Sequence, residues 1–408
     1  MRSKVSWTAE RKPVDRARRI LCGFAALLVL ACARGGADPA EREQPIVRDS
    51  GLAGFVQLIG TLSEPGGYFP SDNLVSNETS YLHVIPMLRE LGVEGGAYVG
   101  VGPDQNFSYI AHIKPEIAFI IDIRRDNLLH HLLLKALFQH ARNRLEYLCL
   151  MVARPVPSDL ERWNEATIDE IVLYVDTVSA RSSPDIELFE RVHNQLIGTV
   201  QSFGYPLAES DLAVIRRFHA TFFDFGLGIR YSHNRRGGFY RFPTWRQLML
   251  QTDLDGNRLS YLASEESFRV VQDLERRHRV VPVVGDLAGP HALEAIGREA
   301  AARGLPIRAF YVSNVEQYLM QGPEFYRFAG TVTDLPFDDR SVLIRSYFAR
   351  RWAIPQTMPN HMSAQLLERF EDFVREQDEG GYLSYMDLVT KNVLPLSGAA
   401  DSLRAAAH

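Results

Sequence analysis

The chain has 408 residues, of which 46% are hydrophobic and 23% are charged, and its 45 basic and 50 acidic side chains give a net charge of −5. This composition is ordinary for a globular protein and excludes a fibrous, disordered or multi-span membrane protein. The acidic excess also argues against general binding to nucleic acid, because an acidic surface repels phosphate backbones. The length allows one large domain with insertions, or two smaller ones.

The first 32 residues are predicted to be an export signal. A basic stretch at residues 11–19 precedes an almost wholly apolar run at residues 20–31. Secretory signals have this form, whereas a bilayer-spanning helix needs about 20 apolar residues. The sequence VLAC at residues 29–32 resembles a bacterial lipobox, so we expect lipidation at Cys32 and an exported, periplasmic or cell-envelope lipoprotein that touches the membrane only through this anchor. The alternative is a cytoplasmic protein with a mis-assigned start.

Cleavage before Cys32 would make the chain more acidic. Residues 1–31 carry seven basic and two acidic side chains, a net +5, so the mature chain would have a charge of −10 instead of −5. Residues 33–62 are interpreted as a tether from the anchor. Only Cys149 would remain outside the signal, so we expect no internal disulfide, and we expect this cysteine to be a buried, inert thiol.

Short apolar runs alternate with helical segments from residue 93 onward. The runs lie at residues 97–99, 117–121, 280–284, 307–312 and 342–348. Such runs are typical of strands buried on both faces, as in a parallel sheet. The alternation predicts a Rossmann-like α/β fold, a mostly parallel sheet with helices on both faces, within a domain at residues 63–350.

Several segments are expected to be helical. Residues 155–262 show helices and loops without a strand rhythm, which predicts a large, mainly helical insertion that caps a site. Basic and aromatic side chains at residues 231–241 would either grip an acidic substrate or form a solvated loop. Residues 351–408 are predicted to be a helical C-terminal extension, with helices near 363–377 and 382–391. Two further helices are expected at residues 79–91 and 128–152.

A glycine-containing turn follows the first predicted strand, where residues 98–106 read YVGVGPDQN. A Gly-x-Gly sequence lets the backbone approach a ligand closely, and the next helix N-terminus can receive an anionic group. The G-x-G-x-x-G fingerprint is incomplete, because glutamine stands at the third glycine position. The candidate binding residues are Gly100, Gly102, Asp104, Gln105 and Asn106. The alternative is a tight turn without a ligand.

Polar residues also follow the next three predicted strands. Asp122 ends the second strand, where a carboxylate commonly accepts hydrogen bonds from ribose hydroxyls. Asp286 follows the third strand and Asn314 the fourth. Ligands of open α/β sheets gather at these carboxyl ends, so the pattern predicts a site for a small nucleoside-type molecule. The alternatives are helix caps or, for Asp122, a salt bridge to Arg124 or Arg125.

On these residues, the chain from about residue 93 to 350 resembles class I S-adenosylmethionine-dependent methyltransferases. The resemblance implies that the glycine turn is the family's first motif, that Asp122 is its acidic second-strand end, and that Asp286 and Asn314 belong to its third and fourth motifs. The segments YVGVGPDQNFSYI, AFIIDIRRDN, PVVGDLAGP and FYVSNVEQYL also resemble an uncharacterised bacterial family with a Rossmann-like core. The long insertion departs from the methyltransferase pattern, as does the helical character of the chain after residue 348, where antiparallel strands are expected.

S-adenosylmethionine is therefore the expected cofactor, and methyl transfer to an unidentified acceptor the expected activity. Glu316 and Tyr311, at the mouth of the fourth strand, are the candidate catalytic residues where the acceptor must lose a proton. Asn77 and Glu78 precede the first strand and would bond the amino-acid end of the cofactor, or else cap a helix.

No metal site is expected, because no HExxH, CxxC or EF-hand pattern occurs, and the adjacent His130 and His131 are expected to pack in the core. The alternative function is an exported, lipid-anchored binding protein on the same fold without turnover, because S-adenosylmethionine is a cytoplasmic metabolite. The sequence does not predict an oligomeric state.

Overall fold

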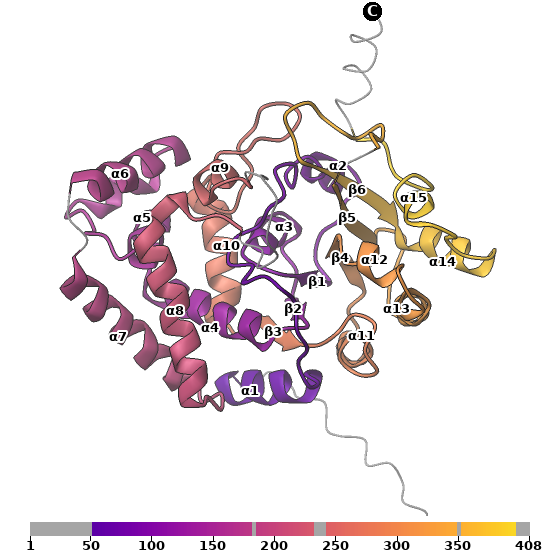
Figure 1. Ribbon diagram of the computed structural model, residues 1–408, viewed down its shortest axis with the longest axis horizontal. Helices are drawn as coiled ribbons and strands as arrows, with labels where there is room; N and C mark the ends of the chain where they lie inside the picture. Colours follow the sequence, from indigo (N-terminus) through magenta and orange to yellow (C-terminus); the bar gives the residue numbers. More distant parts are fainter. Residues whose placement is uncertain (1–50, 182–184, 232–241, 349–351, 397–408) are drawn as a thin grey trace, which may run out of the picture. The chain divides into compact units, whose positions relative to one another are not determined.

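The computed structural model describes residues 51–181, 185–231, 242–348 and 352–396 (Figure 1). The predicted export signal, Cys32 and residues 33–50 of the predicted tether lie outside these ranges. So does most of the basic and aromatic segment at residues 231–241. Within the described ranges, no helix combines the length and the apolar character that a membrane span requires.

A six-stranded sheet forms the centre of the fold, with the strand order β3-β2-β1-β4-β5-β6. All neighbouring strands are parallel except β5 and β6, which are antiparallel. The strands are β1 (Ala97–Val101), β2 (Ile117–Asp122), β3 (Val280–Val284), β4 (Ile307–Ser313), β5 (Val342–Phe348) and β6 (Ser363–Arg369). The predicted mixed α/β fold with a mostly parallel sheet is therefore confirmed.

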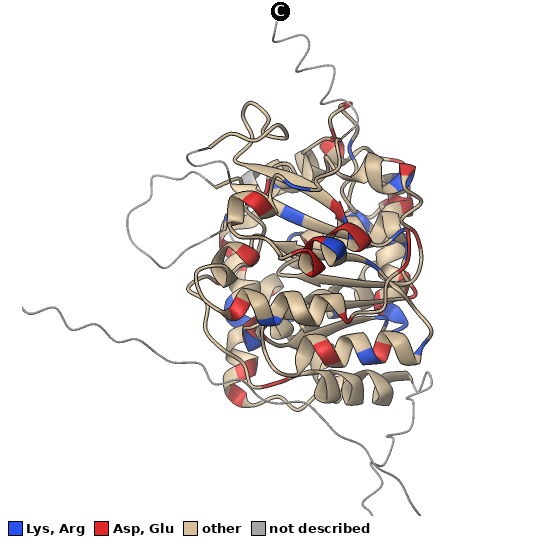
Figure 2. Cartoon of the chain, turned by 90° about the vertical axis from the view of Figure 1, so that its right-hand side faces the viewer, with Lys and Arg blue, Asp and Glu red and all other residues tan. Residues whose placement is uncertain are grey.

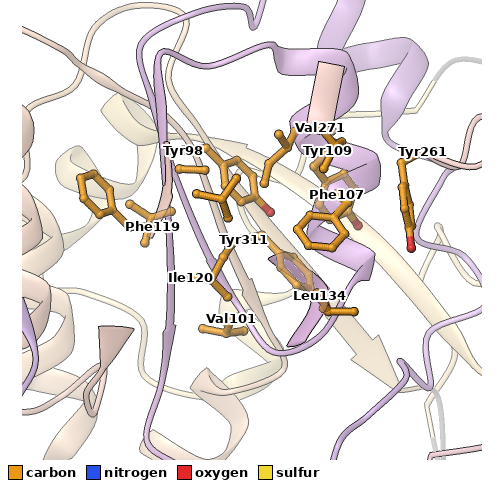
Figure 3. Packing of buried hydrophobic residues seen from close by; sticks show 14 of the residues in the cluster. Tyr98, Val101, Phe107, Tyr109, Phe119, Ile120, Leu134, Tyr261, Val271 and Tyr311 are labelled. Carbon is orange, nitrogen blue, oxygen red and sulfur yellow. The ribbon is translucent and has the colours of Figure 1, made fainter. Parts of the chain in front are cut away.

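Helices cover the sheet on both sides (Figure 1). On one side α3 (Gln105–Ile113), α4 (Arg125–His140) and α10 (Glu265–Arg276) pack against one another, and α11 (Ala292–Ala302) and α13 (Glu324–Thr333) lie on the other. Figure 3 shows how α3 contributes Phe107 and Tyr109 to the core beside Tyr98 of β1 and Tyr311 of β4.

The predicted insertion is helical, as expected. It contains α6 (Ile168–Arg181), α7 (Ile186–Ser202), α8 (Glu209–Phe225) and α9 (Trp245–Met249), with short 3₁₀ turns at Leu160–Asn164 and Gly226–Gly228. Helices α7 and α8 pack against α4, so this part of the insertion thickens the side of the sheet that α4 covers. The remaining helices are α1 (Gly51–Leu62), α2 (Ile85–Glu90), α5 (Arg144–Met151), α12 (Glu316–Leu319), α14 (Phe370–Asp378) and α15 (Tyr385–Leu388).

The predicted helix at residues 363–377 is wrong in its first half. Residues 363–369 form β6, antiparallel to β5, and only Phe370–Asp378 is helical. The segment contains good helix formers, but its polar side chains find partners across the sheet: Gln365 accepts a hydrogen bond from Ser346 of β5, and Glu368 pairs with Arg345 of β5. The resemblance to class I methyltransferases implies two strands after residue 348, and the described residues contain one of them, β6.

Three other boundaries differ from the prediction. The expected helix at residues 128–152 is two helices, α4 and α5, because Ala141 has an extended backbone and Asn143 caps α5 by accepting a hydrogen bond from the Glu146 amide. The helix predicted at residues 79–91 is restricted to α2, and turns precede it. The predicted tether at 33–62 is wrong for its last twelve residues, because α1 (Gly51–Leu62) packs against β3 and α11 through its apolar face.

Acidic and basic side chains are interspersed on the helices. In the view of Figure 2, Asp and Glu alternate with Lys and Arg along the same helices.

Cys149 is a free, buried thiol, and burial raises its pKa to about 12, which agrees with the expected inert role.

Buried histidines make the fold sensitive to acid. Burial lowers the pKa of His219 on α8 from 6.5 to about 4, while its Nε2 lies 3.1 Å from the Leu150 carbonyl oxygen. A histidine whose folded-state pKa is depressed contributes stability that is complete above about pH 6.5 and is lost as the pH falls towards about 4, because the unfolded chain binds the proton first. Relative to a His219→Gln variant, the wild type should therefore lose up to about 3 kcal/mol of unfolding free energy between pH 7 and pH 4. Urea unfolding of both proteins across this range measures the difference, and a difference that does not change with pH would contradict the expectation.

Candidate functional site

The strand order creates a topological switch point between β1 and β4. The chain proceeds from β1 outward to β2 and β3, then returns to the other side of β1 with β4 and β5. In such sheets, ligands bind outside the carboxyl ends of the strands at this point. The glycine turn, Asp122, Asp286 and Asn314 follow the carboxyl ends of β1, β2, β3 and β4, so these predicted residues share one edge of the sheet.

The glycine turn is filled by the protein's own side chains. A Cβ atom on Gly100 would overlap with Oδ1 of Asn106 and lie 2.7 Å from the Tyr98 hydroxyl. Asn106 is fully buried, accepts a hydrogen bond from Tyr98 Oη (2.8 Å) and donates to the carbonyl oxygens of Val101 and Pro103. Internal packing therefore explains glycine at position 100, and Asn106 stabilises the turn from inside instead of facing a ligand.

Asp104 points beneath α9. Its Oδ2 accepts hydrogen bonds from Trp245 Nε1 (2.9 Å) and from Tyr261 Oη (3.2 Å). Burial raises the pKa of Asp104 to about 6, against the lowering effect of these two donors. This carboxyl group therefore links the turn after β1 to Trp245 and Tyr261, near the end of the insertion, and does not face the carboxyl ends of the strands.

A strap formed by residues 63–78 crosses the carboxyl ends of the strands. At β3, the Glu64 amide donates to the Val284 carbonyl oxygen (2.9 Å). The Glu64 carboxylate in turn accepts hydrogen bonds from the amides of Asp286, His291 and Ala292 at the start of α11. A carboxylate at a helix N-terminus is favourable, because it receives otherwise unpaired amides and faces the positive end of the helix dipole.

At β2 the strap is held by an arginine. Arg124 forms a buried ion pair with Asp122 (2.9 Å) and also donates to the carbonyl oxygens of Ser71 (2.6 Å) and Asp72 (2.8 Å). Nearby, the Gly67 amide donates to the Ile123 carbonyl oxygen (2.7 Å). Asp122 thus makes the salt bridge to Arg124 that the sequence allowed as an alternative to ribose binding.

At β1 and β4 the strap ends in a buried carboxylate. Glu78, only 1% exposed, accepts hydrogen bonds from Gln105 Nε2 (2.7 Å), Tyr311 Oη (2.8 Å), Ser313 Oγ (2.6 Å) and Gln365 Nε2 (2.7 Å). Ser76 of the strap also donates to Gln105 Oε1. Four donors from α3, β4 and β6 thus converge on one carboxylate at the switch point.

The two candidate catalytic residues lie in buried networks. Burial, and next the nearby Glu78 charge, raise the pKa of Tyr311 well above its usual range. Glu316 pairs with Arg345 (2.6 Å), which also pairs with Glu368, and burial raises the pKa of both carboxyl groups despite the guanidinium. Tyr311 and Glu316 therefore stabilise the β4 end of the fold, and neither faces an open surface.

Three predicted residues are half-buried at the strand edge. They are Asn77, Asp286 and Asn314. The Asp122 side chain is 11% exposed, and both of its oxygens accept hydrogen bonds from Arg124. Ser313, the last residue of β4, has φ of +52°, a left-handed conformation that non-glycine residues rarely adopt. Asp286 accepts a hydrogen bond from the Ala288 amide (2.9 Å), which holds its carboxylate at the tip of the turn after β3.

Phe69, Tyr318 and Tyr231 form an aromatic rim near the Asp122–Arg124 pair, and Tyr231 comes from the basic and aromatic segment noted in the sequence. Phe69 of the strap meets the ring of Tyr318 edge-on, with 5.6 Å between the ring centres, and Tyr318 is 47% exposed. Tyr231 lies close enough to Tyr318, Arg124 and Asp122 for their charges to influence its pKa, which is raised mainly by burial. An aromatic face can stack on a nucleobase, and a neighbouring carboxylate can accept hydrogen bonds from a ribose.

The described residues hold no group of three or more His, Cys, Asp or Glu side chains with the geometry of a metal site. His130 and His131 are buried, as predicted. His130 packs against Phe218 and Phe222, and His131 Nε2 lies 2.9 Å from the Gly102 carbonyl oxygen.

Comparison with known proteins identifies one family. A family model described as a domain of unknown function (DUF7790) matches residues 73–161 and 231–398. The matched segments contain all six strands of the sheet, whereas α6, α7 and α8 lie between them. No curated protein matches the chain.

Proposed function

The chain belongs to the DUF7790 family, a domain of unknown function, and from that premise we propose that it is a methyltransferase-like protein that binds S-adenosylmethionine or a close nucleoside relative at the strand edge. The observation that carries the proposal is the convergence of Asp122, Asp286 and the aromatic rim at the carboxyl ends of adjacent strands.

The sheet supports this ligand class. Five parallel strands in the order 3-2-1-4-5, with an antiparallel strand beside the fifth, agree with what the resemblance to class I methyltransferases implies. Asp122 would accept hydrogen bonds from the two ribose hydroxyls, and Asp286 from the amino group of the base. Tyr318 and Tyr231 would stack against the base.

Binding requires part of the strap to move. Both ends of the strap are held by hydrogen bonds. At one end Glu64 accepts from amides at the start of α11, and at the other end Glu78 accepts from four donors. Between them, residues 65–68 are exposed and contain Gly66 and Gly67. Displacement of this middle part would break the Gly67–Ile123 hydrogen bond and open the strand edge. Asp122 would bind a ligand only once Arg124, which donates to both of its carboxylate oxygens, also moved away at the cost of their ion pair. Return of the strap over the ligand would exclude water.

Methyl transfer is a displacement that depends chiefly on alignment and on exclusion of water, and S-adenosylmethionine supplies the electrophilic methyl group when it is bound. The chain's contribution is then to orient the nucleoside at Asp122 and Asp286 and to close the strap. Asn314 and the strained Ser313 lie at the β4 end, where an acceptor would approach.

A second candidate is ligand binding without turnover, as in an exported, lipid-anchored binding protein. Two observations favour it. Tyr311 and Glu316 are committed to buried networks, and residues 1–32 have the form of a lipoprotein signal. Mass spectrometry of the mature N-terminus in fractionated cells separates the candidates, because an acylated Cys32 supports export and an intact start supports a cytoplasmic enzyme.

The direct test is thermal unfolding of the purified chain with S-adenosylmethionine or S-adenosylhomocysteine. At about 100 times its dissociation constant, either ligand should add roughly 2.7 kcal/mol to the free energy of unfolding. An Asp122→Asn variant should lose this effect, because the amide accepts hydrogen bonds from the ribose hydroxyls less well than a carboxylate.

Asp126→Asn is the matched control, since Asp126 lies on the first turn of α4 and pairs with Arg217 at the surface (3.3 Å). It should respond to ligand as the wild type does. Absence of any shift with either nucleoside at millimolar concentration would overturn the proposal, as would an Asp122→Asn variant that binds like the wild type.

A further inference from the structure

A cavity of about 390 Å³ lies beside the start of β1, at the opposite end of that strand from the strap. Its walls come from the end of α2 and the loop after it, the end of α3, the loop before α10 and the start of α10. The side chains used below are Arg89, His112, Lys114, Arg258, Ser264 and Ser267. All six lie within the segments that the family model matches.

Arg89 is oriented in this cavity without losing its charge. Its Nη2 lies 3.0 Å from Nδ1 of His112, and His112 Nε2 lies 2.8 Å from the Leu259 carbonyl oxygen. A carbonyl oxygen only accepts, so Nε2 carries the proton, and Nδ1 of the neutral ring accepts from Arg89. Burial, and then the charges of Arg89 and Lys114, lower the pKa of His112, which keeps the ring neutral. A neutral partner fixes the guanidinium while its positive charge stays available.

Two other cations line the same cavity. Lys114 has φ of +49° at the end of α3, and its Nζ is 3.9 Å from Glu266, whose side chain is 85% exposed, so the pairing is weak. Arg258 pairs with Asp169 on α6 (3.0 Å) at a partly exposed position. Glu94 and Glu266 are the acidic residues in the wall, and Asp169 already pairs with Arg258. Arg89, bonded to a neutral imidazole, and the weakly paired Lys114 are therefore the cations that a ligand would meet.

Hydroxyl groups and a helix start complete the lining. Ser264 caps α10, a helix of twelve residues, by accepting a hydrogen bond from the Ser267 amide (3.1 Å). Ser264 also donates to the Ser267 hydroxyl (3.0 Å), so the Ser267 hydroxyl is the one whose proton can be given to a ligand beside the basic side chains.

We propose that this cavity binds a small tetrahedral dianion, a phosphate group that is either free or part of a small phosphate ester. A guanidinium fork, an ammonium and a hydroxyl group approach from different elements, and together they match the several oxygens of a phosphate better than the planar pair of a carboxylate. The site is separate from the proposed nucleoside site, so the two proposals succeed or fail independently.

The test is calorimetric titration of the full chain with inorganic phosphate at constant ionic strength. Binding should be detectable in the millimolar range or tighter, and Arg89→Gln should weaken it at least tenfold. Arg298→Gln, a surface arginine of α11 paired with Glu294, is the control and should bind like the wild type. Glycerol phosphate binding more tightly than phosphate would identify an ester ligand, and equal binding a free anion.

His112 is a positioning residue, and its variants test the argument for Arg89. In His112→Gln the amide oxygen can accept from Arg89 and the amide nitrogen can donate to Leu259, so phosphate affinity should stay near that of the wild type. His112→Leu should weaken binding severalfold. The proposal is overturned if phosphate does not bind, if malonate binds as well as phosphate, or if Arg89→Gln and Arg298→Gln bind alike.

Discussion

Replacement of Glu78 by methionine should lower the free energy of unfolding by about 4 kcal/mol. The substitution leaves four buried donors, Gln105, Tyr311, Ser313 and Gln365, without their shared acceptor. Hydrogen bonds to a charged group contribute about 1.5–3 kcal/mol each, and a buried donor left unpaired costs about 1–3 kcal/mol, although such effects are not additive. Urea unfolding of the full chain measures the change.

A graded series separates this network from a general effect of charge removal. Glu78→Gln keeps one acceptor oxygen for the donors, and its amide can donate to Ser313, so we expect a loss of only about 1 kcal/mol. Glu94→Met removes an exposed carboxylate and should change stability by less than about 0.5 kcal/mol. If Glu78→Met were as stable as Glu94→Met, the carboxylate would not hold the strap.

Replacement of Arg345 by methionine should be similarly severe, at about 3–5 kcal/mol. Arg345 is the shared cationic partner of Glu316 and Glu368, and all three side chains are almost completely buried. Removing one member of a buried ionic network leaves the others as uncompensated charges in a medium of low polarity. Denaturant unfolding at pH 8 should show the full loss.

The pH dependence of the Arg345 variant identifies the cause. Burial already raises the pKa of Glu316 and Glu368, and loss of the guanidinium raises both further. A carboxyl group whose pKa is raised in the folded state destabilises the fold fully above that pKa. This destabilisation disappears as the pH falls towards the pKa of the same group in the unfolded chain. The loss of stability caused by Arg345→Met should therefore shrink between pH 8 and pH 5. A variant that also carries Glu316→Gln and Glu368→Gln should recover much of the stability at pH 8. A defect of equal size at both pH values would point to lost packing instead.

The strands of the sheet could be predicted because their signal is local. Runs such as IAFII at residues 117–121 are apolar at every position. A strand buried on both faces has this pattern, and a run of five residues is too short for a typical buried helix. The insertion could be predicted as well, because the 108 residues from 155 to 262 show no strand pattern and are therefore helical or irregular. Helix ends were less clear, because the break at Ala141 depends on backbone and capping at Asn143 and not on hydrophobicity.

Strand β6 could not be recognised in this way. Its sequence SAQLLER has the composition of a helix, and Gln365 and Glu368 look like a polar helix face. They are buried because β5 offers Ser346 and Arg345 at matching positions. Secondary structure here follows from long-range pairing, which local propensity does not contain.

The sequence by itself determined the α/β class, the parallel strands and the presence of polar residues after four of them. The tertiary structure alone decided what those residues contact. It placed Glu64, Arg124 and Glu78 along one strap, gave Asp122 an internal partner, and brought Phe69 near Tyr318. The physical reason is that burial and hydrophobic periodicity are encoded in neighbouring residues, whereas the partner of a polar side chain is set by segments far apart in the chain, as Glu78 and Gln365 are.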